Sequence, residues 1–365
     1  MNILFDIGHP AHVHLYRYVI QELSNRGHNI TITVRDIPAA RRLLDEYGFE
    51  YLVLGSKRDS LLGKLTDLIR YDLQAMQIVR KKKIDIGVGS SIVLPHMSVF
   101  TKMKSIVLDD DDDEVEPLFR IFAHPFATVL LSPDVLSGKR RRKDTLFYPG
   151  YHELAYLHPS RFQPDLSVLD EVGVKEGETF FLLRFNAFKA HHDRGIRGLS
   201  PGQKEKLISK LLEKGRVLIT SERNSDPVFD ACLINVGHSK IHSLMYYATM
   251  FIGDSQTMSS EAAVLGTPSL RLNSFAGRIS YLEEEEHKYG LTFAFTPDQF
   301  DELLEKAEEL LARTRLKEEW QKRRKAMLAE KIDLSSFLAW FIQNYPESMV
   351  KATQDRDFMR RFSGT

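Results

Sequence analysis

The sequence predicts an α/β protein made of two parallel-sheet halves that face each other across a cleft. Apolar strands alternate with amphipathic helices in both halves of the chain. Proline and glycine interrupt this alternation between residues 148 and 177. The 365 residues are also enough for two domains, since single cores rarely grow beyond ~250–300 residues.

The first half begins with an apolar strand at 3–5. A helix at 11–26 follows, and its apolar residues recur at the three- and four-residue spacing of one helical face. Further strands are expected at 30–34, 51–54, 84–88, 105–108 and 128–131, and further helices at 38–47 and 61–82. Right-handed connections between such parallel strands give a doubly wound sheet.

The second half repeats the architecture without a sequence repeat. Strands are expected at 180–184, 217–220, 250–253 and 268–272, and helices at 201–213, 242–248, 259–265, 298–313 and 334–345. We therefore expect a first domain at 1–160 and a second at 175–345. The polar tail at 346–365 either frays or packs back on the first domain.

Composition excludes several classes of protein. Lysine plus arginine equals aspartate plus glutamate, at 50 each, so the chain lacks the basic footprint of a nucleic-acid-binding protein. The single cysteine, Cys232, excludes an internal disulfide and a cysteine-rich zinc site. No apolar stretch approaches the ~18 residues of a membrane span, and the N-terminus has no signal-peptide pattern. A cytoplasmic protein is the expectation, of unknown oligomeric state.

The segment at 253–268 predicts an anion site, because small polar residues separate a strand from a helix. Free N–H groups at a helix N-terminus attract phosphate, and Glu261 could accept hydrogen bonds from a ribose diol. The candidate phosphate contacts are Ser255, Gln256 and Thr257. The alternative is plain N-capping by Asp254 or Ser255.

The loop after the first strand should face the cleft, because ligands lie beyond the carboxyl ends of parallel strands. Gly8 is a candidate phosphate contact, and His9 and His12 are candidate catalytic groups that donate or accept a proton. His12 and His14 point to opposite sides of a helix, which disfavours a metal site. His14 is expected to cover the sheet.

Two further segments follow strand ends. The cationic loop at 184–198 offers Arg184 as a phosphate contact and His192 as a catalytic group, with a solvated turn as the alternative. The aspartate run at 109–113 is either a solvated loop or the source of a catalytic base, Asp109 or its neighbour Asp110. Hard oxygen ligands could hold Mg²⁺, but no metal is expected.

Two basic segments raise the alternative of a peripheral membrane contact. The pentamer at 139–143 could touch anionic lipid or an acidic substrate, although an exposed loop is the default. The helix at 61–82 mixes cations with apolar residues, although such a helix more often covers a sheet.

The segment at 253–268 resembles the nucleotide-binding signature of the non-hydrolysing UDP-N-acetylglucosamine 2-epimerases. The residues that match in register are Asp254, Ser255, Glu261, Ala262, Leu265, Gly266 and Pro268. Gln256 and Thr257 stand where that signature has two glycines. The region is also similar to the donor site of GT-B glycosyltransferases. Over its length, from the stretch at 6–12 through 148–157 and 184–199, the chain resembles the domain-of-unknown-function 354 family.

These resemblances imply a GT-B fold of two Rossmann-like domains with a nucleotide-sugar, of UDP type, as substrate and no separate cofactor. We expect a glycosyltransferase of surface polysaccharide or glycoconjugate synthesis, acting on an unknown acceptor. The alternatives are a UDP-sugar 2-epimerase-like isomerase and a non-catalytic nucleotide-sugar-binding protein. The opening loop lacks the Gly-Thr-Arg-Pro-Glu type motif of the epimerases, which favours transfer.

Overall fold

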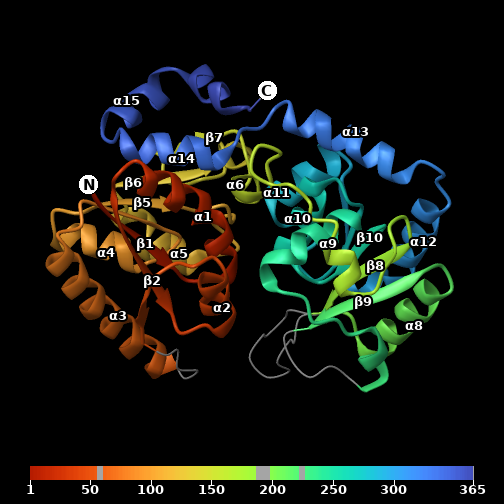
Figure 1. Ribbon diagram of the computed structural model, residues 1–365. Coiled ribbons are helices and arrows are strands. Elements are labelled where there is room, and N and C mark those ends of the chain that lie inside the picture. Colours follow the sequence, from red (N-terminus) through yellow and green to blue (C-terminus); the bar gives the residue numbers. More distant parts are fainter. Residues whose placement is uncertain (56–60, 186–197, 222–226, 365) are drawn as a thin grey trace. The chain divides into compact units, whose positions relative to one another are not determined.

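The computed structural model describes residues 1–55, 61–185, 198–221 and 227–364 (Figure 1). The chain forms two compact units. Unit 1 comprises Met1–Arg161 and Glu330–Thr365, and unit 2 comprises Phe162–Ala329. Each unit contains one parallel sheet with helices against it.

The sheet of unit 1 has seven parallel strands in the order β3-β2-β1-β4-β5-β6-β7. Its strands are β1 (Asn2–Ile7), β2 (Asn29–Arg35), β3 (Leu52–Leu54), β4 (Ile86–Gly89), β5 (Lys104–Leu108), β6 (Val129–Pro133) and β7 (Leu146–Tyr148). The strand order reverses between β1 and β4. Ligands of open α/β sheets bind at such a switch point, beyond the carboxyl ends of the strands.

Helices cover both faces of this sheet (Figure 1). They are α1 (Pro10–Asn25), α2 (Pro38–Glu46), α3 (Leu61–Lys82), α4 (Val93–Phe100), α5 (Pro117–Phe122), α6 (Leu154–Leu157), α14 (Leu334–Gln343) and α15 (Glu347–Gln354), with short 3₁₀ turns η1 (His124–Phe126), η2 (Asp134–Leu136) and η7 (Arg356–Phe362). Successive residues of β1 face opposite sides, as the pleat requires. Leu4 joins a core with Ala75 of α3 and Leu94 of α4, and Phe5 packs against Tyr16 of α1.

The helix α3 is part of this core. Tyr71, Ala75 and Val79 are buried in the cluster that includes Leu4. It therefore covers the sheet, the default expected for the segment at 61–82. None of the described helices combines the length and the apolar character that a membrane crossing requires.

The chain returns to unit 1 after unit 2. Ser335 of α14 donates to the carbonyl of Ala155 at 2.7 Å, and Asp333 accepts from Arg161 at 2.7 Å. Residues 330–345, which the sequence analysis placed in the second domain, therefore belong to unit 1. The periodicity of the sequence shows that this helix has an apolar face, but not which sheet that face covers.

The sheet of unit 2 has five parallel strands in the order β12-β11-β10-β8-β9. Its strands are β8 (Phe180–Phe185), β9 (Arg216–Ser221), β10 (Met250–Gly253), β11 (Ser269–Leu272) and β12 (Thr292–Phe295). The order reverses between β8 and β10, so this unit has its own switch point.

The helices of unit 2 connect these strands. They are α7 (Val168–Glu171), α8 (Pro201–Leu212), α9 (Ile241–Tyr247), α10 (Gln256–Leu265), α11 (Ser280–Glu283), α12 (Phe300–Leu311) and α13 (Leu316–Leu328), with a π-helical turn η5 (Glu284–Lys288) and 3₁₀ turns η3 (Pro227–Cys232), η4 (His238–Lys240) and η6 (Pro297–Gln299). A capping box of Ser200 and Gln203 starts α8. Gly266 ends α10 with φ at 74°, the left-handed conformation that glycine adopts without strain.

Candidate functional site

The segment after β1 lies at the switch point of unit 1. His9 is the N-cap of α1, and its Nδ1 accepts the N–H of Ala11 at 3.2 Å. The N–H of Gly8 donates to Nδ1 of His12 at 3.3 Å. The amide of Gly8, a predicted phosphate contact, therefore already has an acceptor within its own loop. His9 is exposed and His12 is half-buried.

The histidines of this segment do not converge on one point. His14 is buried, with its ring stacked on Tyr156 at 5.3 Å and its Nδ1 3.0 Å from the hydroxyl of Tyr47. The rings of His9 and His12 lie edge to face, 6.0 Å apart. His14 thus packs against Tyr47 and Tyr156, and only His9 and His12 remain at the switch point.

The aspartate run does not form a solvated loop. Asp109 and Asp113 are buried, and the guanidinium of Arg140 lies 3.0 Å from the first and 2.7 Å from the second. Nε2 of His124 lies 2.7 Å from the same oxygen of Asp109, Oδ2, that Arg140 contacts. Asp109, the predicted catalytic base, therefore has structural partners that hold its carboxylate inside the unit.

Asp110 is better placed for chemistry. Its Oδ2 lies 3.0 Å from Nδ1 of His152. Burial raises the pKa of Asp110, but His152, a backbone hydrogen bond and His12 together outweigh burial and hold that pKa below its ordinary value. Burial and then the neighbouring His9 and His152 lower the pKa of His12 to about 3, which Asp110 opposes. Asp110 is therefore ionised and His12 neutral at physiological pH.

Asp111 has the opposite protonation tendency. Burial raises its pKa, and the carboxylates of Asp110 and Asp109 raise it further. The pKa values of these two adjacent carboxyl groups therefore diverge. Asp110 favours the ionised form and Asp111 the neutral form. Such a divergence is typical of sites that use an acid and a base.

Residues from further strand ends complete this cluster. The hydroxyl of Tyr16 on α1 lies 3.2 Å from Oγ of Ser90, which follows β4. Tyr148, at the end of β7, is fully buried, and burial with the nearby Asp110 raises the pKa of its hydroxyl. Sequence reasoning assigned no role to Ser90, Tyr148 or His152. His152 follows the short strand β7, which was not predicted, so the strand-end rule could not find it.

The carboxylates of Asp109, Asp110 and Asp111 offer oxygen atoms within 4.8 Å of one another. Oxygen atoms so close suit a divalent cation. Arg140 already lies 3.0 Å from Asp109 and His152 3.0 Å from Asp110, so both carboxylates have partners within the protein. The expectation that no metal is used stays a prediction.

The predicted anion segment lies at the switch point of unit 2. Ser255 is the N-cap of α10, and its Oγ accepts the N–H of Met258 at 3.3 Å. The helix begins at Gln256, earlier than predicted, so Gln256 and Thr257 form its first turn. These residues are half-buried. The N-capping interpretation is therefore correct for Ser255, and the same geometry leaves the first N–H groups of α10 oriented for an anion.

Glu261 lies one turn further along α10 and is buried. Its Oε1 lies 3.0 Å from Nε2 of His242 on α9, and both side chains are nearly inaccessible to water. The ring of Phe162 meets His242 edge-on at 6.5 Å. Sequence reasoning found Glu261 but missed His242, because no local pattern links the helices α9 and α10.

Arg184, the penultimate residue of β8, lies beside the strand that leads into the anion segment. It is in register with Gly253 of β10. A Cβ at Gly253 would lie 2.4 Å from the carbonyl oxygen of Arg184, so only glycine allows this approach. The carbonyl of Arg184 also accepts the N–H of Asp254 at 3.3 Å, so its backbone lies next to the start of the anion segment. The predicted catalytic His192 lies outside the described residues, as does most of its loop.

A buried cation, Arg271 of β11, was not anticipated. Its side chain is fully buried, and its guanidinium nitrogens have no hydrogen-bond acceptor among the described residues. Burial lowers the pKa of Arg271, while Tyr281 and Glu286 oppose that shift. A single arginine within an apolar strand gives no sequence signal that distinguishes it from a surface residue.

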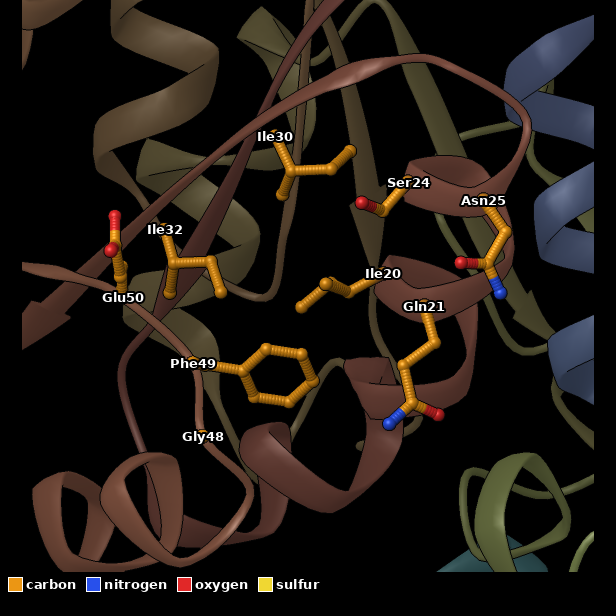
Figure 2. Close-up of a pocket in the computed structure, with 9 residues that line it drawn as sticks. All are labelled: Ile20, Gln21, Ser24, Asn25, Ile30, Ile32, Gly48, Phe49 and Glu50. Carbon is orange, nitrogen blue, oxygen red and sulfur yellow. The ribbon is translucent and has the colours of Figure 1, made fainter.

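A pocket of unit 1 lies away from these clusters (Figure 2). It is formed by the end of α1, the start of β2 and the segment at 48–50, with Ile20, Ile32 and Phe49 among its walls. It is therefore at the amino edge of the sheet. The acidic and histidine side chains gather at the carboxyl edge, where catalytic groups of such sheets are found.

Comparison with known proteins defines the family. Residues 1–280 match the model of a family described as a protein of unknown function, DUF354. An uncharacterized protein of Methanocaldococcus jannaschii, MJ0665, is 20% identical over 281 residues, which cover 74% of this chain and 81% of that protein.

Solved structures define the fold. The Staphylococcus aureus MnaA structure with UDP has a TM-score of 0.68 at 12% identity, covering 95% of this chain and 97% of that one. UDP-GlcNAc 2-epimerase of Neisseria meningitidis, bound to UDP-GlcNAc, has a TM-score of 0.63 at 14% identity and covers 96% and 100%. The glycosyltransferase VinC, in complex with dTDP, has a TM-score of 0.58 at 12% identity and covers 97% and 100%.

These structures share the arrangement of two parallel α/β sheets that the sequence predicted, so the predicted fold class is confirmed. Identities this low carry no activity from one protein to another. The chain belongs to the DUF354 family and has the GT-B fold of the UDP-GlcNAc 2-epimerases and GT-B glycosyltransferases.

Proposed function

We propose that this chain is a glycosyltransferase that transfers a sugar from a UDP-sugar to an acceptor hydroxyl. The observation that carries the proposal is the Asp110–His152 pair, 3.0 Å apart, beside His12 at the switch point of unit 1. In this proposal Asp110 removes the proton of the acceptor. A general base of this kind must be ionised at the operating pH, and His152 favours that state.

Unit 2 holds the nucleotide in this proposal. The first turn of α10, capped by Ser255, offers N–H groups to the diphosphate, and Arg184 supplies a positive charge beside them. The departing diphosphate gains negative charge, which a helix N-terminus and a guanidinium stabilise. Glu261 accepts the ribose hydroxyls, and His242 fixes its orientation.

A 2-epimerase is the second candidate, because one observation favours it. Asp110 is driven toward the ionised form and Asp111 toward the neutral form. Epimerisation at C-2 needs a base to remove the proton and an acid to return one, whereas transfer needs only the base. The fold of the epimerases is consistent with either reaction.

The test uses purified full-length protein and UDP-GlcNAc in D₂O, followed by proton NMR. Glycosyl transfer releases UDP when an acceptor is present and leaves the C-2 proton of the donor in place. Epimerisation exchanges that proton for deuterium and forms the C-2 epimer. Binding of UDP is measured separately by calorimetry, since a ligand can bind without turnover.

The Asp110→Asn variant should lose turnover by at least about a hundredfold, the usual contribution of a general base, while UDP affinity is retained. Glu114→Gln is the matched control, because Glu114 is an exposed carboxylate of the same loop. Deuterium exchange at C-2 would show that the reaction is epimerisation and not transfer. UDP binding without turnover of any UDP-sugar would instead indicate a non-catalytic binding protein. Absence of UDP binding would refute the proposal.

A further inference from the structure

The short helix α5 presents its apolar side to water. Ile121 and Phe122 lie three and four residues after Leu118, so the three side chains share one face of the helix. They are 63%, 49% and 44% exposed. Phe119, on the other side of the helix, packs against the buried Val107 and its neighbours. In a surface helix of a globular protein, the apolar stripe normally faces the core and not the solvent.

The neighbouring elements α4 and η1 also expose apolar side chains. Val99 and Phe100, at the end of α4, are 55% and 68% exposed, and Phe126 of η1 is 44% exposed. Hydrogen bonds hold these elements together, since Nε2 of His96 lies 3.0 Å from the carbonyl of Phe122 and Ser98 donates to that of Phe126 at 3.1 Å. We call these exposed side chains the α4–α5 patch. Its members are Val99, Phe100, Leu118, Ile121, Phe122 and Phe126.

Exposed cations border the patch. Lys102 and Lys104 follow α4 directly. On another side, Nη1 of Arg142 donates to the carbonyls of His124 and Ala127, at 2.5 and 2.8 Å, and so fixes the basic segment at 139–143 against η1.

The segment at 139–143 also presents cations at the surface. The side chain of Arg140 is buried and forms ion pairs with Asp109 and Asp113. The exposed cations of the segment are Lys139, Arg141 and Lys143. The exposed carboxylates nearby are Glu114 and Glu116 at the start of α5 and Asp144, which pairs with Arg142. The exposed cations outnumber them along the α4 and η1 sides.

We propose that the α4–α5 patch docks on an anionic lipid surface, with α5 lying in the plane of the interface. Apolar side chains that enter the acyl boundary, flanked by lysine and arginine that meet lipid phosphates, are the two elements of such a contact. The patch combines them on adjacent segments. No transmembrane helix is needed for this mode of binding.

Charge distinguishes this partner from a second copy of the chain. Pairing through a two-fold axis brings the same patch of both copies together. It would therefore place Lys102, Lys104 and the segment at 139–143 near their own counterparts, where like charges repel. An anionic surface is attracted by those same groups.

The docking surface is connected to the candidate site of unit 1. His124 belongs to η1, between Phe122 and Phe126, and its Nε2 lies 2.7 Å from the carboxylate of Asp109. Asp110 is the next residue along the chain. The patch itself lies toward the amino ends of β5 and β6, since Phe100 precedes the first and Phe126 the second, so His124 is what links the docking surface to the carboxyl edge of this sheet.

The test is co-sedimentation of the full chain with vesicles of phosphatidylcholine, with or without phosphatidylglycerol. We expect binding to the mixed vesicles that weakens as salt is added, because surface charges are screened. Ile121→Ser with Phe122→Ser should weaken binding roughly tenfold or more, since two apolar side chains no longer enter the lipid. Lys139→Glu with Lys143→Glu should also weaken it.

The control is Val350→Ser, because Val350 is an apolar residue of α15 that is 54% exposed outside the patch. Its binding should equal that of the wild type, and circular dichroism checks that all variants are folded. Two results would overturn the proposal. One is absence of binding to both vesicle types. The other is self-association in sedimentation velocity that the Ile121→Ser, Phe122→Ser variant abolishes.

Discussion

Arg140 should contribute more to the stability of unit 1 than any surface cation, because it neutralises carboxylates that water does not reach. Its Nη1 lies 2.7 Å from Asp113 and 3.0 Å from Asp109, and each of the side chains is 8% exposed or less. Two charge-assisted hydrogen bonds amount to about 3–6 kcal/mol. Removing one partner of a buried ion pair costs about 3–5 kcal/mol. We therefore expect Arg140→Met to lower the free energy of unfolding by about 3–5 kcal/mol.

The assay can report on unit 1 alone. The chain has two tryptophans, and Trp340 lies in unit 1 while Trp320 lies in unit 2. In a Trp320→Phe background, urea unfolding followed by fluorescence reads Trp340, whose ring is 4.6 Å from that of Phe358. Arg141→Met is the control. It removes an exposed charge next to Arg140 and should change stability by no more than about 0.5 kcal/mol.

The pH dependence provides an independent check. Burial raises the pKa of Asp113, but Arg140 reverses this and holds that pKa below its ordinary value. The stabilisation in the wild type is thus present above the unfolded pKa of about 3.9 and is lost as the pH falls through the folded pKa. Without Arg140, burial is the largest influence on the pKa of Asp113 and is opposed only by the N–H of Arg141 and by His124, so we expect Asp113 to bind a proton more readily folded than unfolded.

The variant should therefore gain stability relative to the wild type as the pH falls from about 7 toward about 4.5. The difference between the two proteins would shrink over that range. The assignment of Arg140 as the neutralising group would be refuted if Arg140→Met lowered the free energy of unfolding by less than about 1 kcal/mol at neutral pH. It would also be refuted if that decrease were equal at both pH values.

Two predictions concern unit 2. Glu261→Gln should weaken UDP binding on the order of tenfold, the value of a hydrogen bond to a charged group, and affect 2′-deoxy-UDP much less; calorimetry that gives equal losses for both nucleotides would remove Glu261 from the ribose. Ser255→Ala should lower the stability of unit 2 by about 1 kcal/mol through loss of the α10 cap, measured by chemical denaturation. If its UDP affinity also falls, Ser255 contacts phosphate as well as capping the helix, and unchanged affinity would leave capping as its only role.

Much of the fold could be predicted because buried parallel strands and amphipathic helices leave strong periodic patterns. The elements that escaped prediction have weak patterns. The strand β7 has three residues, Leu146–Tyr148, too few to show a period. The helix α13, Leu316–Leu328, is mostly charged and buries only Leu316, Trp320 and Met327. The unit to which α14 belongs depends on long-range packing, which no window of sequence contains.

The location of the site could be predicted, but the role of each residue in it could not. The strand-end rule selected the residues after β1, β5, β8 and β10. It could not choose among five adjacent aspartates, because they are chemically identical in the sequence. Arg140 and His124 bind Asp109, whereas His152 binds Asp110. These partners lie more than ten residues away, and the fold alone brings them to the aspartates.

The replacement of two glycines by Gln256 and Thr257 has a local physical meaning. Both residues are in the first turn of α10, a right-handed helix, so their side chains introduce no backbone strain. Glycine at these positions would serve only to let an anion approach the backbone closely. Here an amide and a hydroxyl stand at the helix start instead, and both are hydrogen-bond donors. A diphosphate at this position would therefore meet side-chain donors before the backbone. It follows that Thr257→Gly should not damage the fold of α10 beyond the helix propensity of glycine, about 1 kcal/mol, whereas it should change how the diphosphate is held.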